Sequence, residues 1–193
     1  SVEQAEATAE AGVAVFGCGP IGLAAIATLV DAGNERVVAI DPSPTRRALA
    51  NGLGALAAVD PTTDDVWSAL ADLHGTTPFM FGPTPATAAY IEASGVAGVL
   101  SSILERGAPG GRLAVVALHY APIKTSFLTL LMKQFTVRGS MEYPARFEDA
   151  VDLLARRDLS ALTTHRFPLA DLSEALALLD GSKDCGKVSV LPG

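Results

Sequence analysis

The sequence predicts an α/β protein built on a doubly wound parallel sheet, with helices on both faces and a C-terminal extension. Short apolar runs rich in β-branched residues alternate along the chain with segments whose apolar residues recur at helical spacing. A glycine-rich turn joins the first apolar run to the first helical segment. No repeat of fixed period interrupts this alternation. The pattern is typical of one domain with an appendage, which suits a chain of 193 residues.

The predicted elements share simple boundaries. Strands are apolar runs that end at Gly or acidic residues, and several helices are closed by Gly. The proline-rich stretch 76–87 is expected to be an exposed loop, most simply a tolerated insertion. In chain order, we expect strands at 13–16, 36–40, 89–92, 112–118, 135–138 and 187–191, and helices at 20–32, 45–52, 66–73, 99–106, 127–133, 147–156 and 172–179.

Composition excludes several classes of protein. Lys and Arg total 14 against 21 Asp and Glu, so the chain lacks the basic surface that non-specific nucleic-acid binding needs. Cys18 and Cys185 cannot form a disulfide framework, and three His residues without metal-ligand spacing indicate no zinc site in this chain. The longest apolar run, 22–30, is far shorter than the ~20 residues of a membrane span. We expect a soluble, cytoplasmic protein that binds neither nucleic acid nor membrane.

The most informative motif is residues 17–22, Gly-Cys-Gly-Pro-Ile-Gly, which follows a predicted strand and opens a predicted helix. Gly17 permits a tight turn, Gly19 lets a diphosphate approach the backbone, and Gly22 lets the helix pack close to the strand. Pro20 suits the first helical turn, where its missing N–H costs nothing. The free N–H groups of that turn favour an anion. The motif predicts a dinucleotide-binding turn.

Asp41 ends the second predicted strand, 19 residues after Gly22. A carboxylate there can accept hydrogen bonds from an adenosine ribose and would repel a 2′-phosphate, which favours NAD over NADP. Arg46 and Arg47 are the competing observation, because they could contact such a phosphate. The alternative role for Asp41 is to cap the helix that follows.

Three other residues admit a chemical role beside a plainer one. Cys18 is either a reactive thiol whose pKa the helix N-terminus lowers, or a small residue packed beneath the turn. His119 follows the predicted strand 112–118 on the ligand side of the sheet. His165 is expected to be structural, in a turn before Phe167 and Pro168.

Taken together, the motifs resemble the coenzyme-binding half of medium-chain dehydrogenases, the zinc-type alcohol/polyol dehydrogenase family, whose doubly wound sheet is a Rossmann fold. The resemblance runs from Gly12 to near the end of the chain. The matching segments, in the family's order, are 13–23, 41–47, 92–95, 109–112, 138–140, 164–169 and 186–188.

The resemblance implies a set of cofactor contacts. Asp41 and Arg46 would flank the adenosine ribose, and Ser94 and Gly95 would lie near the adenosine and nicotinamide riboses. The full implied set is Gly17, Gly19, Pro20, Ile21, Gly22, Asp41, Arg46, Ser94, Gly95, Leu118, Ser140, Glu142 and Lys187.

The implied nicotinamide contacts come from later in the chain. Leu118 and the backbone around Ser140 and Glu142 would meet the carboxamide. Lys187 resembles a basic position that approaches the pyrophosphate when two domains close; the alternative is an exposed lysine at the start of a strand.

The resemblance also implies a larger parent protein. Residues 1–142 would be the NAD(P)-binding domain, and residues 143–193 would return to a catalytic half that carries zinc and the proton relay. This chain would then hold no catalytic residue and no metal ligand. The parent would transfer a hydride between NAD and an alcohol or carbonyl substrate, as a homodimer joined at the sheet edge. The isolated chain is expected to bind NAD weakly without turnover.

Two alternatives remain for the domain. One is an S-adenosylmethionine-dependent methyltransferase, which also places a glycine-rich turn and an acidic residue around an adenosine. The other is a non-catalytic nucleotide-binding or redox-sensing module.

Overall fold

A computed structural model describes residues 1–141, 146–181 and 184–192. Its main sheet has six parallel strands in the order β3-β2-β1-β6-β7-β8. The chain starts at the centre with β1, winds outward to β3, and returns to the centre to wind the other way. This is the doubly wound order, and it confirms the predicted fold class. The strands are β1 (Val13–Phe16), β2 (Val37–Ile40), β3 (Ala57–Val59), β6 (Ala89–Glu92), β7 (Arg112–Val115) and β8 (Thr136–Gly139).

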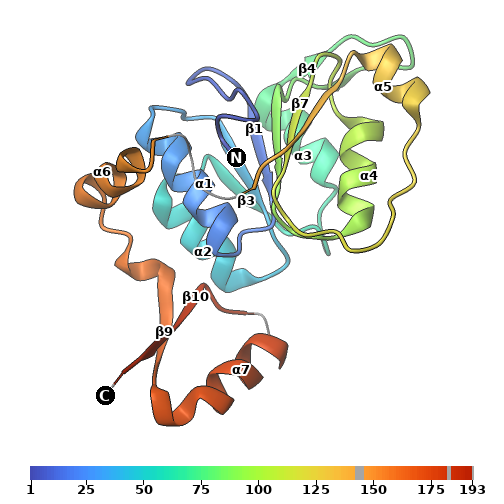
Figure 1. Cartoon of the computed structure of the whole chain (residues 1–193). Helices are drawn as coiled ribbons and strands as arrows, with labels where there is room; N and C mark the ends of the chain where they lie inside the picture. The colour runs from blue at the N-terminus through green and yellow to red at the C-terminus, as the bar shows by residue number, and fades with distance from the viewer. Residues whose placement is uncertain (142–145, 182–183, 193) are drawn as a thin grey trace.

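Helices cover both faces of this sheet (Figure 1). One face packs against α1 (Pro20–Asp31) and α2 (Pro44–Leu53). The other face packs against α3 (Val66–His74) and α4 (Ala97–Arg106), with α5 (Phe127–Lys133) beside α4.

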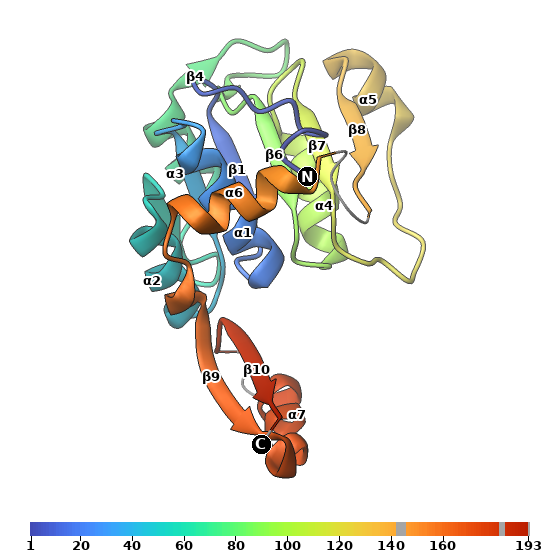
Figure 2. The same cartoon turned by 60° about the vertical axis from the view of Figure 1, so that its left-hand side comes forward.

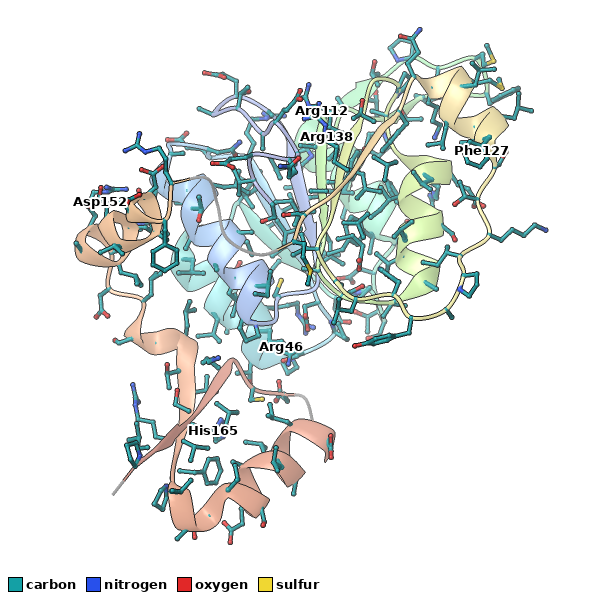
Figure 3. All side chains as sticks on the ribbon, in the orientation of Figure 1. Arg46, Arg112, Phe127, Arg138, Asp152 and His165 are labelled. Atoms are coloured by element: carbon teal, nitrogen blue, oxygen red, sulfur yellow. The ribbon has the colours of Figure 1, made fainter. Side chains whose placement is uncertain are left out.

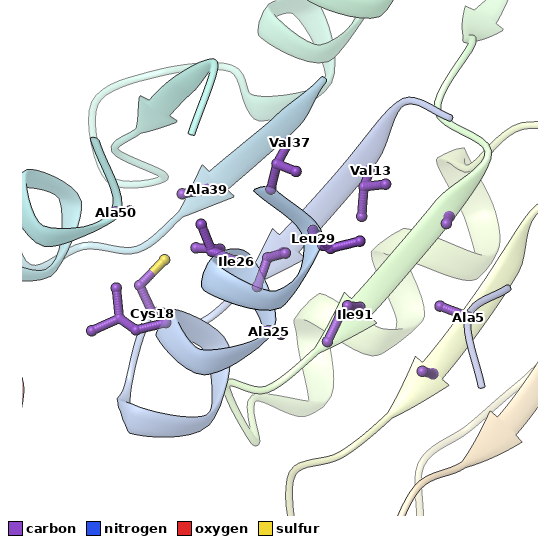
Figure 4. Packing of buried hydrophobic residues seen from close by; sticks show 14 residues of the cluster. Ala5, Val13, Cys18, Ala25, Ile26, Leu29, Val37, Ala39, Ala50 and Ile91 are labelled. Carbon is purple, nitrogen blue, oxygen red and sulfur yellow. The ribbon is translucent and has the colours of Figure 1, made fainter. Parts of the chain in front are cut away.

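The central strands are continuous apolar runs because both of their faces are covered. Every residue of β1, β2 and β6 is buried. In Figure 4, Ile26 and Leu29 of α1 lie over Val13 and Val37 of the strands. Burying each such side chain contributes about 1.5–3 kcal/mol. The core thereby fixes α1, and with it the turn that precedes α1.

The C-terminal part of the chain first packs on the main domain and then forms a small unit of two strands and one helix, seen at the bottom of Figures 1 and 2. We call this unit, residues 163–181 and 184–191, the C-terminal unit. Helix α6 (Glu148–Arg156) lies alongside α1, and the Arg156 guanidinium contacts the Asp31 carboxylate at 2.7 Å. Beyond a 3-10 turn, β9 (Thr163–Pro168) pairs in parallel with β10 (Lys187–Leu191). A second 3-10 turn and α7 (Leu172–Gly181) connect these two strands.

Several predicted elements differ from the structure. The strand expected over 112–118 ends at Val115, because the N–H groups of Val116 and Ala117 both turn to the Glu92 carbonyl. Strands β3 and β9 were not predicted. The stretch 76–87 holds a short antiparallel hairpin, β4 (Thr76–Thr77) and β5 (Thr84–Pro85).

The hairpin lines a cavity of about 540 Å³ with Trp67, Phe79 and residues of α4 and α5. The cavity lies away from the glycine-rich turn. Within the described ranges, none of the helices is long and apolar enough to cross a membrane.

Candidate functional site

The carboxyl ends of five neighbouring strands lie side by side at one end of the sheet. We call this row of strand ends the edge; the outermost strand β8 is named separately. Their last residues pair in register across the sheet, so the residues that follow them emerge side by side. In an open α/β sheet this edge binds ligands at the point where the strand order reverses, here between β1 and β6. The registered residues are Ile40, Phe16, Glu92, Val115 and Gly139.

The glycine turn leaves β1 at this point. Gly17 has φ +89°, and a Cβ on it would lie 2.6 Å from the Ser94 nitrogen. A Cβ on Gly22 would lie 1.9 Å from the Gly17 oxygen, so α1 packs directly against the turn. A Cβ on Gly19 would meet nothing within 4 Å. The backbone is therefore tightly packed behind the turn and open in front of it, as a bound diphosphate requires.

Helix α1 offers that open side its N-terminus. Gly19 is the N-cap and supplies no side-chain hydrogen bond, and Pro20 occupies the first turn as predicted. The side chain of Ile21 is 57% exposed on the same turn. Uncapped N–H groups and the positive end of the helix dipole suit a diphosphate.

Asp41 follows β2 and is only 3% exposed. Its Oδ2 accepts a hydrogen bond from the Cys18 N–H at 2.7 Å, and its Oδ1 accepts one from the Ser43 N–H at 2.8 Å. The carboxylate thus joins the glycine turn to the start of α2. The alternative role as helix cap is wrong, because Ser43 is the N-cap and its Oγ accepts from the Arg46 N–H.

The two competing arginines are both bound to protein groups. The Arg46 Nε donates to the Cys185 carbonyl at 2.7 Å, and its Nη1 lies 3.9 Å from Asp41 Oδ2. Figure 3 shows Arg46 where the main domain faces the C-terminal strands. The Arg47 guanidinium donates to the Asp41 carbonyl and contacts the Asp60 carboxylate at 2.9 Å.

Glu92 organises the next part of the edge, although it is not among the predicted site residues. It is 0% exposed. Its Oε1 accepts from the N–H groups of Ser94 and Gly95 at 2.8 and 3.0 Å and from the Ser94 hydroxyl. Its Oε2 lies 2.7 Å from His119 Nε2. The signal for it was an acidic residue ending a wholly buried strand, since such a group needs partners.

The predicted nicotinamide contacts lie at the same edge. A Cβ on Gly95 would be 3.6 Å from the Leu118 oxygen, and the Leu118 side chain is 61% exposed. The Ser140 N–H donates to the Val115 carbonyl at 2.9 Å. Glu142 lies outside the described residues.

Lys187 lies in the C-terminal unit rather than on the sheet edge. It is exposed and begins β10, paired with Thr163. His165, predicted in a turn, lies in β9, where its ring stacks on Phe167 with centroids 6.4 Å apart. Its predicted place in a turn is therefore wrong.

Cys18 is buried beneath the glycine turn, with Sγ 3.9 Å from the Ile40 oxygen. Burial, and next the Asp41 carboxylate, raise the pKa of the Cys18 thiol to about 12. The reactive-thiol alternative needs a lowered pKa and is therefore wrong.

A zinc ion does not fit the part of the chain that the structure describes. No three His, Cys, Asp or Glu side chains there gather so as to hold a metal ion. The Glu92 and His119 pair supplies two ligand types and no third. A tetrahedral zinc site needs more protein ligands than this.

The strand order, the glycine turn and Asp41 define a nucleotide-binding α/β domain of the dehydrogenase type. The chain belongs to the zinc-binding dehydrogenase family, whose model matches residues 20–156. It corresponds to the nucleotide-binding half of zinc-type alcohol and polyol dehydrogenases.

Individual relatives agree with this assignment. The chain is 31% identical over 180 residues to L-threonine 3-dehydrogenase of Paraburkholderia phytofirmans, covering 91% of this chain and 50% of that protein. The crystal structure of 2R,3R-butanediol dehydrogenase from Bacillus subtilis matches with a TM-score of 0.82 and 29% identity, covering 100% of this chain and 54% of that one. L-idonate 5-dehydrogenase from Escherichia coli matches with a TM-score of 0.81 and 25% identity, covering 98% and 52%.

Two consequences follow from these relatives. The chain spans about half the length of the proteins it matches. All three are dehydrogenases, so the methyltransferase alternative is not favoured.

Proposed function

We propose that this chain binds NAD along the strand edge and serves as the coenzyme half of an enzyme that moves a hydride between NAD and an alcohol or carbonyl compound. The observation that carries the proposal is the hydrogen bond from the Cys18 N–H to the buried Asp41 carboxylate. This contact fixes the diphosphate-binding turn and the ribose-binding acid relative to one another. The relatives supply the reaction class.

Different residues of the edge would contact different parts of the cofactor. The N–H groups at the start of α1 would hold the diphosphate in front of Gly19. Asp41 would accept from the adenosine ribose, since each of its oxygens has a lone pair beyond the one already used. Arg46 would flank the same ribose.

Ser94 and Gly95 would lie near the riboses, and the nicotinamide would lie farther along the edge, against Leu118 and the backbone around Ser140. The hydrogen bonds of Glu92 hold the loop that carries Ser94 and Gly95 in place. The bound nicotinamide supplies the hydride chemistry, and the chain orients it.

The zinc and the proton relay would belong to a catalytic half outside this chain, which spans about half the length of its relatives. Residues 1–142 would form the coenzyme domain, and residues 143–193 would return to that half. Lys187 would reach the pyrophosphate when the two halves close. A homodimer would pair the exposed edge strand β8, which would remove its unpaired backbone groups.

Titration with NADH, NADPH and S-adenosylmethionine tests the proposal. We expect enhanced NADH fluorescence on binding, weaker binding of NADPH, and no calorimetric signal with S-adenosylmethionine. Asp41→Ala should weaken NADH binding and reduce the preference for NADH over NADPH, whereas Asp64→Ala, an exposed carboxylate elsewhere, should leave both unchanged. Preferential binding of S-adenosylmethionine would contradict the proposal, and so would alcohol oxidation by the zinc-free chain alone.

A further inference from the structure

A segment from the far end of the chain covers the start of α2. We call residues 184–186 the strap. The Asp184 carboxylate accepts hydrogen bonds through Oδ1 from the Ser43 hydroxyl and from the Thr45 N–H, the latter at 3.2 Å. The carbonyl of the next residue, Cys185, accepts a hydrogen bond from the Arg46 Nε at 2.7 Å. These contacts join positions about 140 residues apart in the sequence.

The strap is anchored by Cys185 and Gly186, the two residues that follow Asp184. Cys185 is 0% exposed. The Gly186 N–H donates to the Thr164 hydroxyl at 3.0 Å, and a Cβ on Gly186 would lie 2.6 Å from the Leu162 oxygen. The packing leaves no space for a side chain at Gly186 and brings Asp184 to α2.

The strap accepts hydrogen bonds from groups at the start of α2 that could otherwise bind an anion. They are a hydroxyl, a backbone N–H of the first helical turn and a guanidinium, and they follow the ribose-binding Asp41 directly in the chain. A phosphate at such a place gains from the helix N-terminus and from a charged guanidinium. In this chain the Asp184 carboxylate already accepts the hydrogen bonds of Ser43 and Thr45.

We infer that Asp184 is a specificity-determining residue that makes the chain reject dinucleotides with a 2′-phosphate. The inference rests on the proposed function, because it needs the adenosine ribose to lie at Asp41. Asp184 acts in two ways: its carboxylate takes the hydroxyl and the N–H that the phosphate would need, and its negative charge repels the phosphate. The Cys185 carbonyl adds to this effect by holding the Arg46 guanidinium against the strap.

Asp184 remains charged under ordinary conditions. The hydrogen bond from Ser43, followed by those from Thr45 and the nearby Arg46 charge, holds the pKa of Asp184 below its ordinary value. Asp184 thereby adds a second carboxylate beside the start of α2, next to the Asp41 carboxylate that would accept from the ribose.

Two variants of Asp184 and one control separate the effect of its negative charge from the effect of its hydrogen bonds. Asp184→Asn removes the charge and keeps an oxygen acceptor, Asp184→Ala removes both, and Asp158→Ala is the matched control. Asp158 is also an aspartate in the C-terminal part of the chain whose carboxylate accepts a hydrogen bond from a backbone N–H, that of Ser160 at 2.9 Å, rather than from a residue of α2.

The measurement is the dissociation constant of each variant for NADH, NADPH and adenosine 2′-monophosphate, with melting temperatures to confirm folding. For Asp184→Ala we expect NADPH and adenosine 2′-monophosphate to bind about tenfold more tightly, with NADH changed less than about twofold. Asp184→Asn should give part of the gain, and Asp158→Ala none.

Two results would overturn the inference. An unchanged ratio of NADPH to NADH affinity in both Asp184 variants would refute the role of Asp184 while leaving the proposed function standing. Failure of the unaltered chain to bind NADH at all would refute the proposed function, and the inference with it.

Discussion

Gly22 and Gly52 both lie inside helices, but a methyl group at each has opposite consequences. On Gly22 it would lie 1.9 Å from the Gly17 oxygen, whereas on Gly52 of α2 it would meet nothing within 4 Å. Gly22→Ala should therefore lower the free energy of unfolding by about 2–3 kcal/mol and weaken NADH binding by displacing the turn.

Gly52→Ala is the control for this prediction. It should raise the free energy of unfolding by up to about 1 kcal/mol, because alanine is the better helix former. Urea denaturation monitored by circular dichroism measures both variants. Equal stability of the Gly22→Ala protein and the unaltered chain would show that α1 does not pack against the turn as described.

Glu92 lies fully buried with four hydrogen-bond contacts to Ser94, Gly95 and His119. Glu92→Gln removes the negative charge, so that Ser94 and Gly95 would donate to a neutral amide oxygen in place of a carboxylate. We expect the free energy of unfolding to fall by about 2 kcal/mol, since a lost hydrogen bond to a charged group costs about that much.

The exposed Glu35 provides the comparison for Glu92. Glu35→Gln should change the free energy of unfolding by no more than about 0.5 kcal/mol. Chemical denaturation measures the two substitutions side by side. If they had the same small effect, the buried carboxylate would not be holding the loop.

At the scale of elements, His74 joins the end of α3 to two segments that flank β2 and β6. Its Nε2 lies 2.9 Å from the Arg36 oxygen, its Nδ1 lies 2.8 Å from Thr87 Oγ1, and Gly12 packs against the ring. Burial is the main cause that lowers the pKa of His74 below its ordinary value. The folded chain thus holds the ring neutral.

This shift predicts how stability depends on pH. Because the unfolded chain takes up the proton first, the contribution of His74 is complete above about pH 6.5 and is lost as the pH falls from there towards the lower pKa of the folded state. His74→Gln, which cannot titrate, should remove this part of the acid sensitivity. Denaturation between pH 8 and 5 tests the prediction, and parallel profiles for the two proteins would refute it.

The sequence could predict the elements whose pattern is local and strong. The run Val13–Phe16 is apolar throughout and the glycine turn follows it, so both were found. Strand β3 is three residues long, and β9 carries polar residues and pairs only with β10, so neither has a clear pattern of its own. The end of β7 depended on which carbonyl its next N–H groups could reach.

The same division holds for the candidate site. Gly17 and Asp41 could be assigned from their place after predicted strands. The contact between Glu92 and His119 spans 27 positions, and the contact between Ser43 and Asp184 spans 141. Such pairs follow from tertiary packing, for which a single sequence carries no periodic signal.

At the scale of the whole molecule, α6 and α7 expose apolar side chains that the described residues do not cover. Val151 and Leu154 of α6 are 54% and 64% exposed, and Leu176 of α7 is 53% exposed. Under the proposed function, a catalytic half would cover them, as suits a chain half the length of its relatives.

Replacing Val151 and Leu154 by glutamate should therefore lower the binding of a hydrophobic dye to the isolated chain. The free energy of unfolding should stay within about 0.5 kcal/mol of the original value, because exposed positions contribute little to it. Dye fluorescence and chemical denaturation measure the two quantities. A marked loss of stability would show that these side chains already pack within the chain.

The central claim is that the glycine turn and Asp41 hold a dinucleotide at one edge of the sheet. Two-dimensional NMR of the labelled chain during titration with NADH tests it most directly. The account predicts that the largest amide shifts fall at Gly19, Gly22, Asp41 and Gly95, and that the cavity beside the β4–β5 hairpin stays unchanged. Shifts confined to that cavity, or no shifts at the glycine turn at saturating NADH, would contradict it.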